Sequence, residues 1–227
     1  MISKTSGITL GKIKFRETSI IARIFTEKFG LQSYLINGIR SPKGKFKIAL
    51  FQPLTLLDLV VYYKENAGIQ RLSEVKCSYP YSTISGNIKK SVIFIFLTEV
   101  LEKTLRDCSN PEEVFAFLQQ SLIKFDTENE NQSSFHLRFL IEFSAILGFK
   151  PQSIIDFKNH IPSNLHASGR DALLLIKQMI ENKTQKISVS SNSTRRNCLN
   201  LIIAYYRGHI DNLGEIKSVG VLKEILD

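Results

Sequence analysis

Hydrophobic residues in the first 79 positions recur in short runs, rich in β-branched and aromatic side chains, and some runs alternate with polar positions. The runs cover residues 8–15, 19–27, 31–37, 54–64 and 68–77. Turn-forming residues separate them, with Phe-Gly at 29–30, Ser-Pro-Lys-Gly at 41–44 and Glu-Asn-Ala-Gly at 65–68. Five or so strands of this length in about 75 residues predict a small barrel or a sandwich. The strand pattern alone does not distinguish the two.

The period of the hydrophobic pattern becomes helical after the segment SYPYS at 78–82. Segments 87–105, 109–125, 135–147, 169–182, 192–210 and 218–227 are the predicted helices. In the first of them, Ile88, Val92, Phe96, Val100, Leu101 and Leu105 form one apolar stripe. Asn110 before Pro111 and two acids is a good helix start, Gly148 is a predicted helix end, and residues 152–168 are expected to be irregular. We therefore predict an α+β protein with a β domain at 1–80 and an all-helical domain at 81–227.

The charge of the chain is concentrated in the predicted β domain. The whole chain has a net charge of +9, and residues 1–80 hold 13 Lys and Arg against 5 Asp and Glu, which gives +8. The densest segment is 37–47, which contains Arg40, Lys43, Lys45 and Lys47, no acid, and the turn formers glycine and proline. This loop is either a solvated turn or a site for a polyanion, of which nucleic acid is the commonest.

Aromatic residues are interleaved with the cations of the β domain. Single-stranded nucleic acid requires both, because cations bind its phosphates and aromatic rings stack on its bases. Arg16 and Arg23 are candidate phosphate contacts, and Tyr34, Phe46 and Tyr62 are candidate base contacts. Phe25 and Phe51 are assigned to the core.

Sequence motifs of the common enzyme classes are missing. The chain has no Walker A loop, no G-x-G-x-x-G, no H-E-x-x-H and no G-x-S-x-G. The five acids of the β domain are scattered, which disfavours the metal-dependent nuclease or phosphotransferase that is the main alternative function. A protein-binding scaffold whose charge only aids solubility is a third reading. Three dispersed cysteines predict no zinc site, and no segment predicts a membrane span or a signal peptide, so we expect an intracellular protein.

The order of three elements resembles the RecO family of bacterial recombination mediators. These elements are RETSIIARIFTEKFG, NGIRSPKGK and ALFQPLTLLDL, and the likeness continues through FHLRFLIEFSAILGFKP and YYRGHIDNLGEIKSVGVLKEIL. The resemblance implies an oligonucleotide-binding (OB) barrel followed by a helical domain. It implies a non-enzymatic, cytoplasmic, nucleoid-associated protein that binds single- and double-stranded DNA and anneals complementary strands. It also implies action with RecR to load RecA onto DNA covered by single-strand-binding protein.

The resemblance carries over to individual residues only in part. Arg40 and Lys43 keep the basic pattern of the family's loop, whereas Asn37 stands where a lysine is usual. The segment after LGF has none of the paired cysteines that hold zinc in many relatives, so we expect no metal and no cofactor. The acidic tail of single-strand-binding protein needs an apolar pocket beside a cation, and Arg138 is the candidate cation.

Overall fold

The computed structural model describes residues 1–39, 46–106, 108–128, 132–166, 169–181 and 191–226. The chain forms two compact units. Met1–Thr83 and Leu97–Asp126 make up the first, and Ile84–Phe96 and Thr127–Asp227 make up the second. The first unit therefore combines the predicted β domain with helical residues 97–126.

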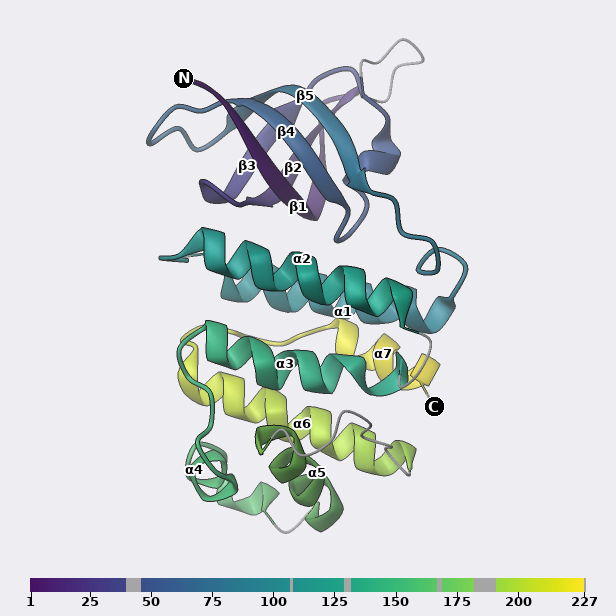
Figure 1. Cartoon of the computed structure of the whole chain (residues 1–227), viewed down its shortest axis with the longest axis vertical. Helices are drawn as coiled ribbons and strands as arrows, with labels where there is room; N and C mark the ends of the chain where they lie inside the picture. Colours follow the sequence, from purple (N-terminus) through teal and green to yellow (C-terminus); the bar gives the residue numbers. More distant parts are fainter. Residues whose placement is uncertain (40–45, 107, 129–131, 167–168, 182–190, 227) are drawn as a thin grey trace. The chain divides into compact units, whose positions relative to one another are not determined.

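Five strands close into a barrel in the first unit (Figure 1). They are β1 (Ile2–Phe15), β2 (Ser19–Thr26), β3 (Gly30–Ile36), β4 (Leu56–Tyr62) and β5 (Gln70–Tyr79). Their order around the barrel is β1-β2-β3-β5-β4, with β4 returning to β1. All neighbours are antiparallel except β3 and β5, which are parallel. The predicted strands are confirmed, and the closed five-stranded barrel is the OB fold rather than a sandwich.

The long strand β1 pairs with two different strands, one along each half of its length. Its first half pairs with β4, from Ile2 opposite Tyr62 to Ile8 opposite Leu56, and its second half pairs with β2. Gly7 lies where the two pairings overlap, and a Cβ atom there would lie 2.7 Å from Leu59 Cδ1. A larger residue would therefore collide with the barrel interior where β1 changes partners.

Inward-facing side chains fill the barrel. The cluster consists of Ile20, Ala22, Ile24, Tyr34, Ile36, Ile39, Phe51, Leu57, Leu59 and Val61. Phe51 lies in the short 3-10 helix η1 (Ile48–Phe51), and both Phe51 and Phe25 are buried, as predicted.

The carboxylate of Asp126 ties helix α2 (Pro111–Thr127) to the segment that leaves the barrel. The helix begins at Pro111, as predicted, and Asp126 is fully buried near its end. Asp126 accepts hydrogen bonds from the Tyr79 hydroxyl (3.2 Å) and from the backbone and hydroxyl groups of Ser82 and Thr83 (2.8–3.0 Å). Burial alone would raise the pKa of this carboxyl, but these hydrogen bonds outweigh it and lower the pKa to about 2.

Helix α1 (Ile88–Thr104) is buried more widely than one stripe. The predicted positions from Val92 to Leu105 are buried, but Ile88 is 66% exposed. Ile93, Phe94 and Leu97, which lie off the stripe, are buried as well. The single-stripe prediction is therefore wrong for Ile88, and α1 is apolar around most of its circumference.

Five further α-helices lie in the described part of the second unit. They are α3 (Phe135–Ile146), α4 (Ile154–Asn159), α5 (Arg170–Ile180), α6 (Asn192–His209) and α7 (Ser218–Leu226). Gly148 adopts a φ of 85° just after α3, which confirms the predicted helix end. The segment 152–168 is not wholly irregular, because it contains α4 and the 3-10 turn η3 (Ser163–Leu165). Within the described residues, none of the helices combines the length and apolarity that a bilayer crossing requires.

Candidate nucleic-acid interface

Arg16 lies in the tight turn between β1 and β2. It is exposed, has a φ of 54°, and places its guanidinium carbon 5.3 Å from the centroid of the Phe15 ring. Left-handed backbone is uncommon for residues other than glycine, so the turn holds this arginine in a defined place. The cation rests over an aromatic face and remains open to solvent.

The basic loop begins beside this turn. Ile36 pairs with Ile20, and the Ser19 hydroxyl donates to Asn37 Oδ1 at 3.2 Å. Asn37, which replaces the usual basic residue, therefore ties the start of the loop to β2. Arg40, Lys43 and Lys45 lie outside the described residues, so their contribution stays a prediction. Lys47 is described, and it is exposed immediately before η1.

Lys12 anchors the far side of the same loop. Its ammonium group donates to Phe51 O at 2.9 Å and to Gln52 Oε1 at 3.4 Å. Burial lowers the pKa of Lys12. This lysine could not be singled out from the sequence, because a cation at a strand position gives no local sign of its distant partner.

Two further cations and an aromatic residue come together through strand register. Arg71 of β5 pairs with Leu35 of β3 on one side and with Tyr62 of β4 on the other. Lys64 follows Tyr62 two residues along the chain. Arg71, Tyr62 and Lys64 are all exposed.

The prediction of Tyr34 as a base contact is wrong. Its side chain is 0% exposed and belongs to the barrel core, and burial raises the pKa of its hydroxyl. Phe46 is partly buried against the same core, so its role in base contact stays a prediction. Tyr62 is 48% exposed, so it is the most accessible to DNA bases of the three candidate aromatic residues.

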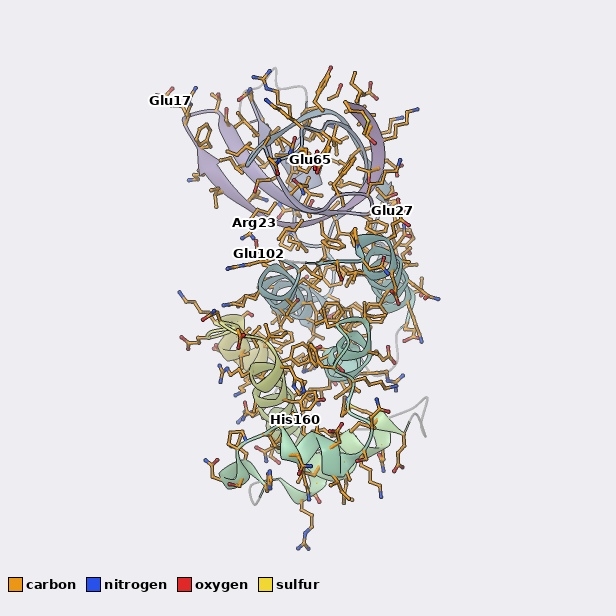
Figure 2. The ribbon with its side chains drawn as sticks, turned by 90° about the vertical axis from the view of Figure 1, so that its left-hand side faces the viewer. Glu17, Arg23, Glu27, Glu65, Glu102 and His160 are labelled. Atoms are coloured by element: carbon orange, nitrogen blue, oxygen red, sulfur yellow. The ribbon has the colours of Figure 1, made fainter. Side chains whose placement is uncertain are left out.

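Arg23 faces a helix of its own unit. Its guanidinium lies 3.5 Å from Glu102 Oε1 of α1, and Figure 2 shows the two side chains close together. Burial raises the pKa of Glu102, and the neighbouring arginine opposes that shift. Arg23 thus already has an acidic partner, whereas Arg16 and Arg71 form no ion pair with any residue that the structure describes. Its predicted contact with phosphate stays untested.

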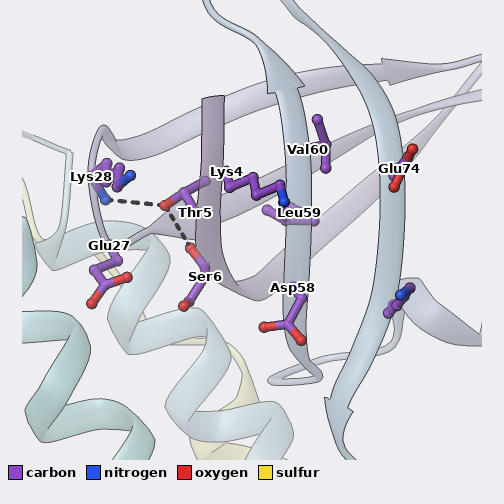
Figure 3. Close-up of a pocket in the computed structure, with 10 residues that line it drawn as sticks. Lys4, Thr5, Ser6, Glu27, Lys28, Asp58, Leu59, Val60 and Glu74 are labelled. Carbon is purple, nitrogen blue, oxygen red and sulfur yellow. Dashed lines mark hydrogen bonds between the residues drawn. The ribbon is translucent and has the colours of Figure 1, made fainter. Parts of the chain in front are cut away.

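A groove of mixed charge lies on the outer face of β1, β4 and β5. It has a volume of about 440 Å³, and its charged lining residues are Lys4, Lys28, Lys76, Glu27, Asp58 and Glu74. In Figure 3, Lys4 extends from β1 toward β4, and Glu74 lies on β5. Three of the five acids in residues 1–80 therefore line one groove together with three lysines. The formal charge of the groove is zero, so it attracts a phosphate backbone less than the exposed cations elsewhere on the barrel do.

The second unit has two candidate sites for the acidic tail of a partner. Arg138 is half-buried on α3. Separately, a shallow pocket between α3, α6 and α7 is lined by Arg195, Arg196 and Lys223 together with Leu199, Leu222, Leu226 and His136. Arg195 Nη1 donates to Leu226 O at 2.7 Å, whereas its Nε atom and His136 Nδ1 are buried without a hydrogen-bond partner in the described part of the chain.

Among the described residues, no three His, Cys, Asp or Glu side chains gather closely enough to hold a metal ion. The histidines of the segment 152–168 are engaged locally. His160 Nδ1 lies 2.9 Å from Asp156 O, and His166 Nε2 lies 3.1 Å from Lys158 O. Both rings therefore have backbone partners.

Comparison with known proteins gives the family. Residues 1–81 match the family described as Recombination protein O N terminal, and residues 85–167 match Recombination protein O C terminal. The chain is 34% identical to DNA repair protein RecO of Bacteroides fragilis over 100% of both chains. It is 33% identical to DNA repair protein RecO of Flavobacterium johnsoniae and 32% identical to that of Flavobacterium psychrophilum, over 98% of each chain. The chain thus belongs to the RecO family of DNA repair proteins.

Proposed function

We propose that this protein binds single- and double-stranded DNA, anneals complementary strands, and acts with RecR to load RecA onto DNA covered by single-strand-binding protein. The activity is non-enzymatic and takes place on the nucleoid in the bacterial cytoplasm. Membership of the RecO family supports the DNA repair role. The finer steps rest on the charge and geometry of the barrel.

The observation that carries the proposal is the set of exposed cations on one connected region of the barrel. Arg16 and Lys47 flank the basic loop, and Arg71 and Lys64 follow through the register of β3, β5 and β4. Cations spaced along a surface bind successive phosphates without reading sequence. The carboxylates of the mixed-charge groove lie outside this region and limit it on the β4–β5 side.

The test is the salt dependence of DNA binding. Each phosphate contact on a single strand contributes about 0.7 to the slope of log K against log salt. Replacing Arg40, Lys43, Lys45 and Lys47 together by alanine should therefore reduce the slope by up to about 3. The matched control removes four exposed cations of the second unit, Arg170, Lys177, Arg207 and Lys217, and should leave the slope unchanged.

The same variant should slow the annealing of complementary oligonucleotides, measured by quenching of a paired dye. An unaltered slope and annealing rate in the loop variant would contradict the assignment of the loop. Cleavage of the oligonucleotides in Mg²⁺ or Mn²⁺, abolished by chelation, would instead favour the nuclease. Loading is tested with RecR, as the rate at which RecA displaces single-strand-binding protein from single-stranded DNA.

The tail of single-strand-binding protein is the proposed peptide partner of the second unit. An acidic peptide with a hydrophobic last residue needs cations beside apolar side chains. Arg195, Arg196 and Lys223 lie with Leu199, Leu222 and Leu226 around a hollow of about 10 Å³ between α3, α6 and α7, which must widen to admit a side chain. Arg138, predicted from the sequence, is the competing site for the same tail.

A further inference from the structure

Helix α7 closes the hollow in the second unit to which we assign the acidic tail. The hollow lies between α3, α6 and α7, and α7 contributes Leu222, Lys223 and Leu226 to its lining. The buried residues of α7 are Ser218, Leu222 and Leu226, which follow one another at intervals of four, so one face of this helix is turned inward. The C-terminal helix therefore covers the surface of α6 on which the peptide would lie.

The contacts that hold α7 use the same groups as the proposed peptide. Arg195 Nη1 of α6 donates to Leu226 O at the end of α7, at 2.7 Å. Lys223 Nζ donates to Asn200 Oδ1 of α6 at 2.8 Å. Residues 224–227 read Glu-Ile-Leu-Asp, so the end of the chain is itself acidic and apolar. Helix α7 thus presents to Arg195 an oxygen acceptor beside leucine side chains, as the tail would.

Three features make α7 easy to displace. It has nine residues, and a helix of this length is unstable by itself in water. Gly220 lies inside it, although a Cβ atom there would meet nothing within 4 Å, and glycine disfavours a helix relative to alanine. His136 and Arg195 line the closed hollow, and His136 Nδ1 and Arg195 Nε are buried without a hydrogen-bond partner among the described residues, which disfavours the closed form.

A peptide can replace α7 at Arg195 because the peptide carries the stronger acceptor. The Leu226 carbonyl is neutral, whereas the last residue of a peptide ends in a carboxylate. Hydrogen bonds from a guanidinium to a carboxylate are stronger than those to a neutral oxygen, and a carboxylate can accept two of them in parallel. Arg196 and Lys223 add positive charge around the same hollow.

We propose that α7 is an internal competitor for the acidic tail. In the closed form, Leu222 and Leu226 occupy the site and Arg195 holds the end of the helix. The tail binds when α7 unfolds and releases Arg195, so its measured affinity is the intrinsic affinity multiplied by the fraction of molecules in which α7 is released. This inference rests on the proposed binding of the tail and adds how that binding is regulated.

The experiment measures binding of a dye-labelled acidic nonapeptide ending in phenylalanine to the full chain, by anisotropy. Asn200→Ala removes the hydrogen bond from Lys223 and leaves the lining of the hollow intact, so it should tighten binding about 2- to 12-fold. Gly220→Ala stabilises α7 where a methyl group has room, so it should weaken binding about 2- to 5-fold. Asn159→Ala, at an exposed position on α4, is the control and should leave the affinity unchanged.

Hydrogen exchange of the α7 amides gives a second readout. Without peptide, Asn200→Ala should speed their exchange and Gly220→Ala should slow it, by the same factors as the changes in affinity. A saturating concentration of the peptide should speed exchange in α7 of the original protein, because the bound peptide keeps the helix released.

Two results would overturn the competition and leave tail binding intact. One is a peptide affinity that changes in neither Asn200→Ala nor Gly220→Ala. The other is slower exchange of the α7 amides when the peptide is bound, which would show that the tail binds to the closed form. Failure of the peptide to bind both the original protein and Asn200→Ala would overturn the proposed tail binding together with this inference.

Discussion

Substitution of Asp126 by asparagine tests whether one buried carboxylate secures the junction between the barrel and α2. The change is nearly isosteric, so packing is kept. It removes the negative charge and one of the two acceptor oxygens. The Tyr79 hydroxyl, the Ser82 hydroxyl and the Ser82 backbone N–H all donate to Oδ2. An amide can offer one oxygen only, so its NH₂ group must face donors on one side.

The magnitude follows from the pKa. A folded value of about 2 against an ordinary value of 3.8 is a difference of about 1.8 units. At 1.36 kcal/mol per unit this corresponds to roughly 2 kcal/mol of stability. Because the folded pKa is the lower one, this stability is fully present above the unfolded value near pH 4. It is lost as the pH falls from about 4 to about 2.

The assay is urea unfolding followed by tyrosine fluorescence at pH 7 and at pH 2.5. Five of the seven tyrosines lie in the first unit, so the signal reports mainly on the barrel. Asp126→Asn should lower the free energy of unfolding by about 2 kcal/mol at pH 7 and by much less at pH 2.5. Asp58→Asn, an exposed acid on β4, should change neither value.

An equal loss at both pH values would refute the electrostatic reasoning, since it would show that the cost comes from packing. A loss below about 0.5 kcal/mol at pH 7 would show that the hydrogen bonds to Ser82 and Thr83 contribute little net stability.

Two further predictions concern the second unit. Lys90 is 0% exposed, and its ammonium group donates to Glu128 O at 3.0 Å. Lys90→Met should therefore lower the free energy of unfolding in urea by about 1–3 kcal/mol. The control is Lys89→Met at an exposed position, which should lower it by less than about 0.5 kcal/mol. Arg195→Ala should weaken the binding of an acidic peptide with a hydrophobic C-terminus at least tenfold, measured by calorimetry. Arg138→Ala should weaken it less. If Arg138→Ala causes the larger loss of affinity, the peptide binds at Arg138 instead.

The five strands could be predicted because each is a local pattern. Which side chains of a strand point into the barrel and which point to solvent could not be predicted. In the run LQSYLIN, Tyr34 and Ile36 share one face while Leu31 and Leu35 share the other, so both faces carry apolar residues. The structure puts Tyr34 inside and Leu35 outside. The alternation was therefore compatible with either orientation, and only barrel closure decides between them.

Long-range pairings explain the other differences. The pairing of Arg71 with Leu35 and Tyr62 and the Arg23–Glu102 ion pair depend on register and helix placement, which no local spacing encodes. Helix α4 did carry a local sign, because Ser153 and Asp156 have the spacing of an N-terminal cap and Ser153 Oγ accepts from Asp156 N at 3.1 Å. The helix has only six residues and lies among turn-forming residues, so the apolar pattern there is too short to predict it.

The pairing between β3 and β5 is the shortest ladder of the barrel, with two residue pairs, Tyr34–Gln70 and Leu35–Arg71. Each of the other four seams has at least seven pairs, so we expect the barrel to part first between β3 and β5. Any ligand that bridges these two strands should therefore favour the closed form of the barrel by linkage.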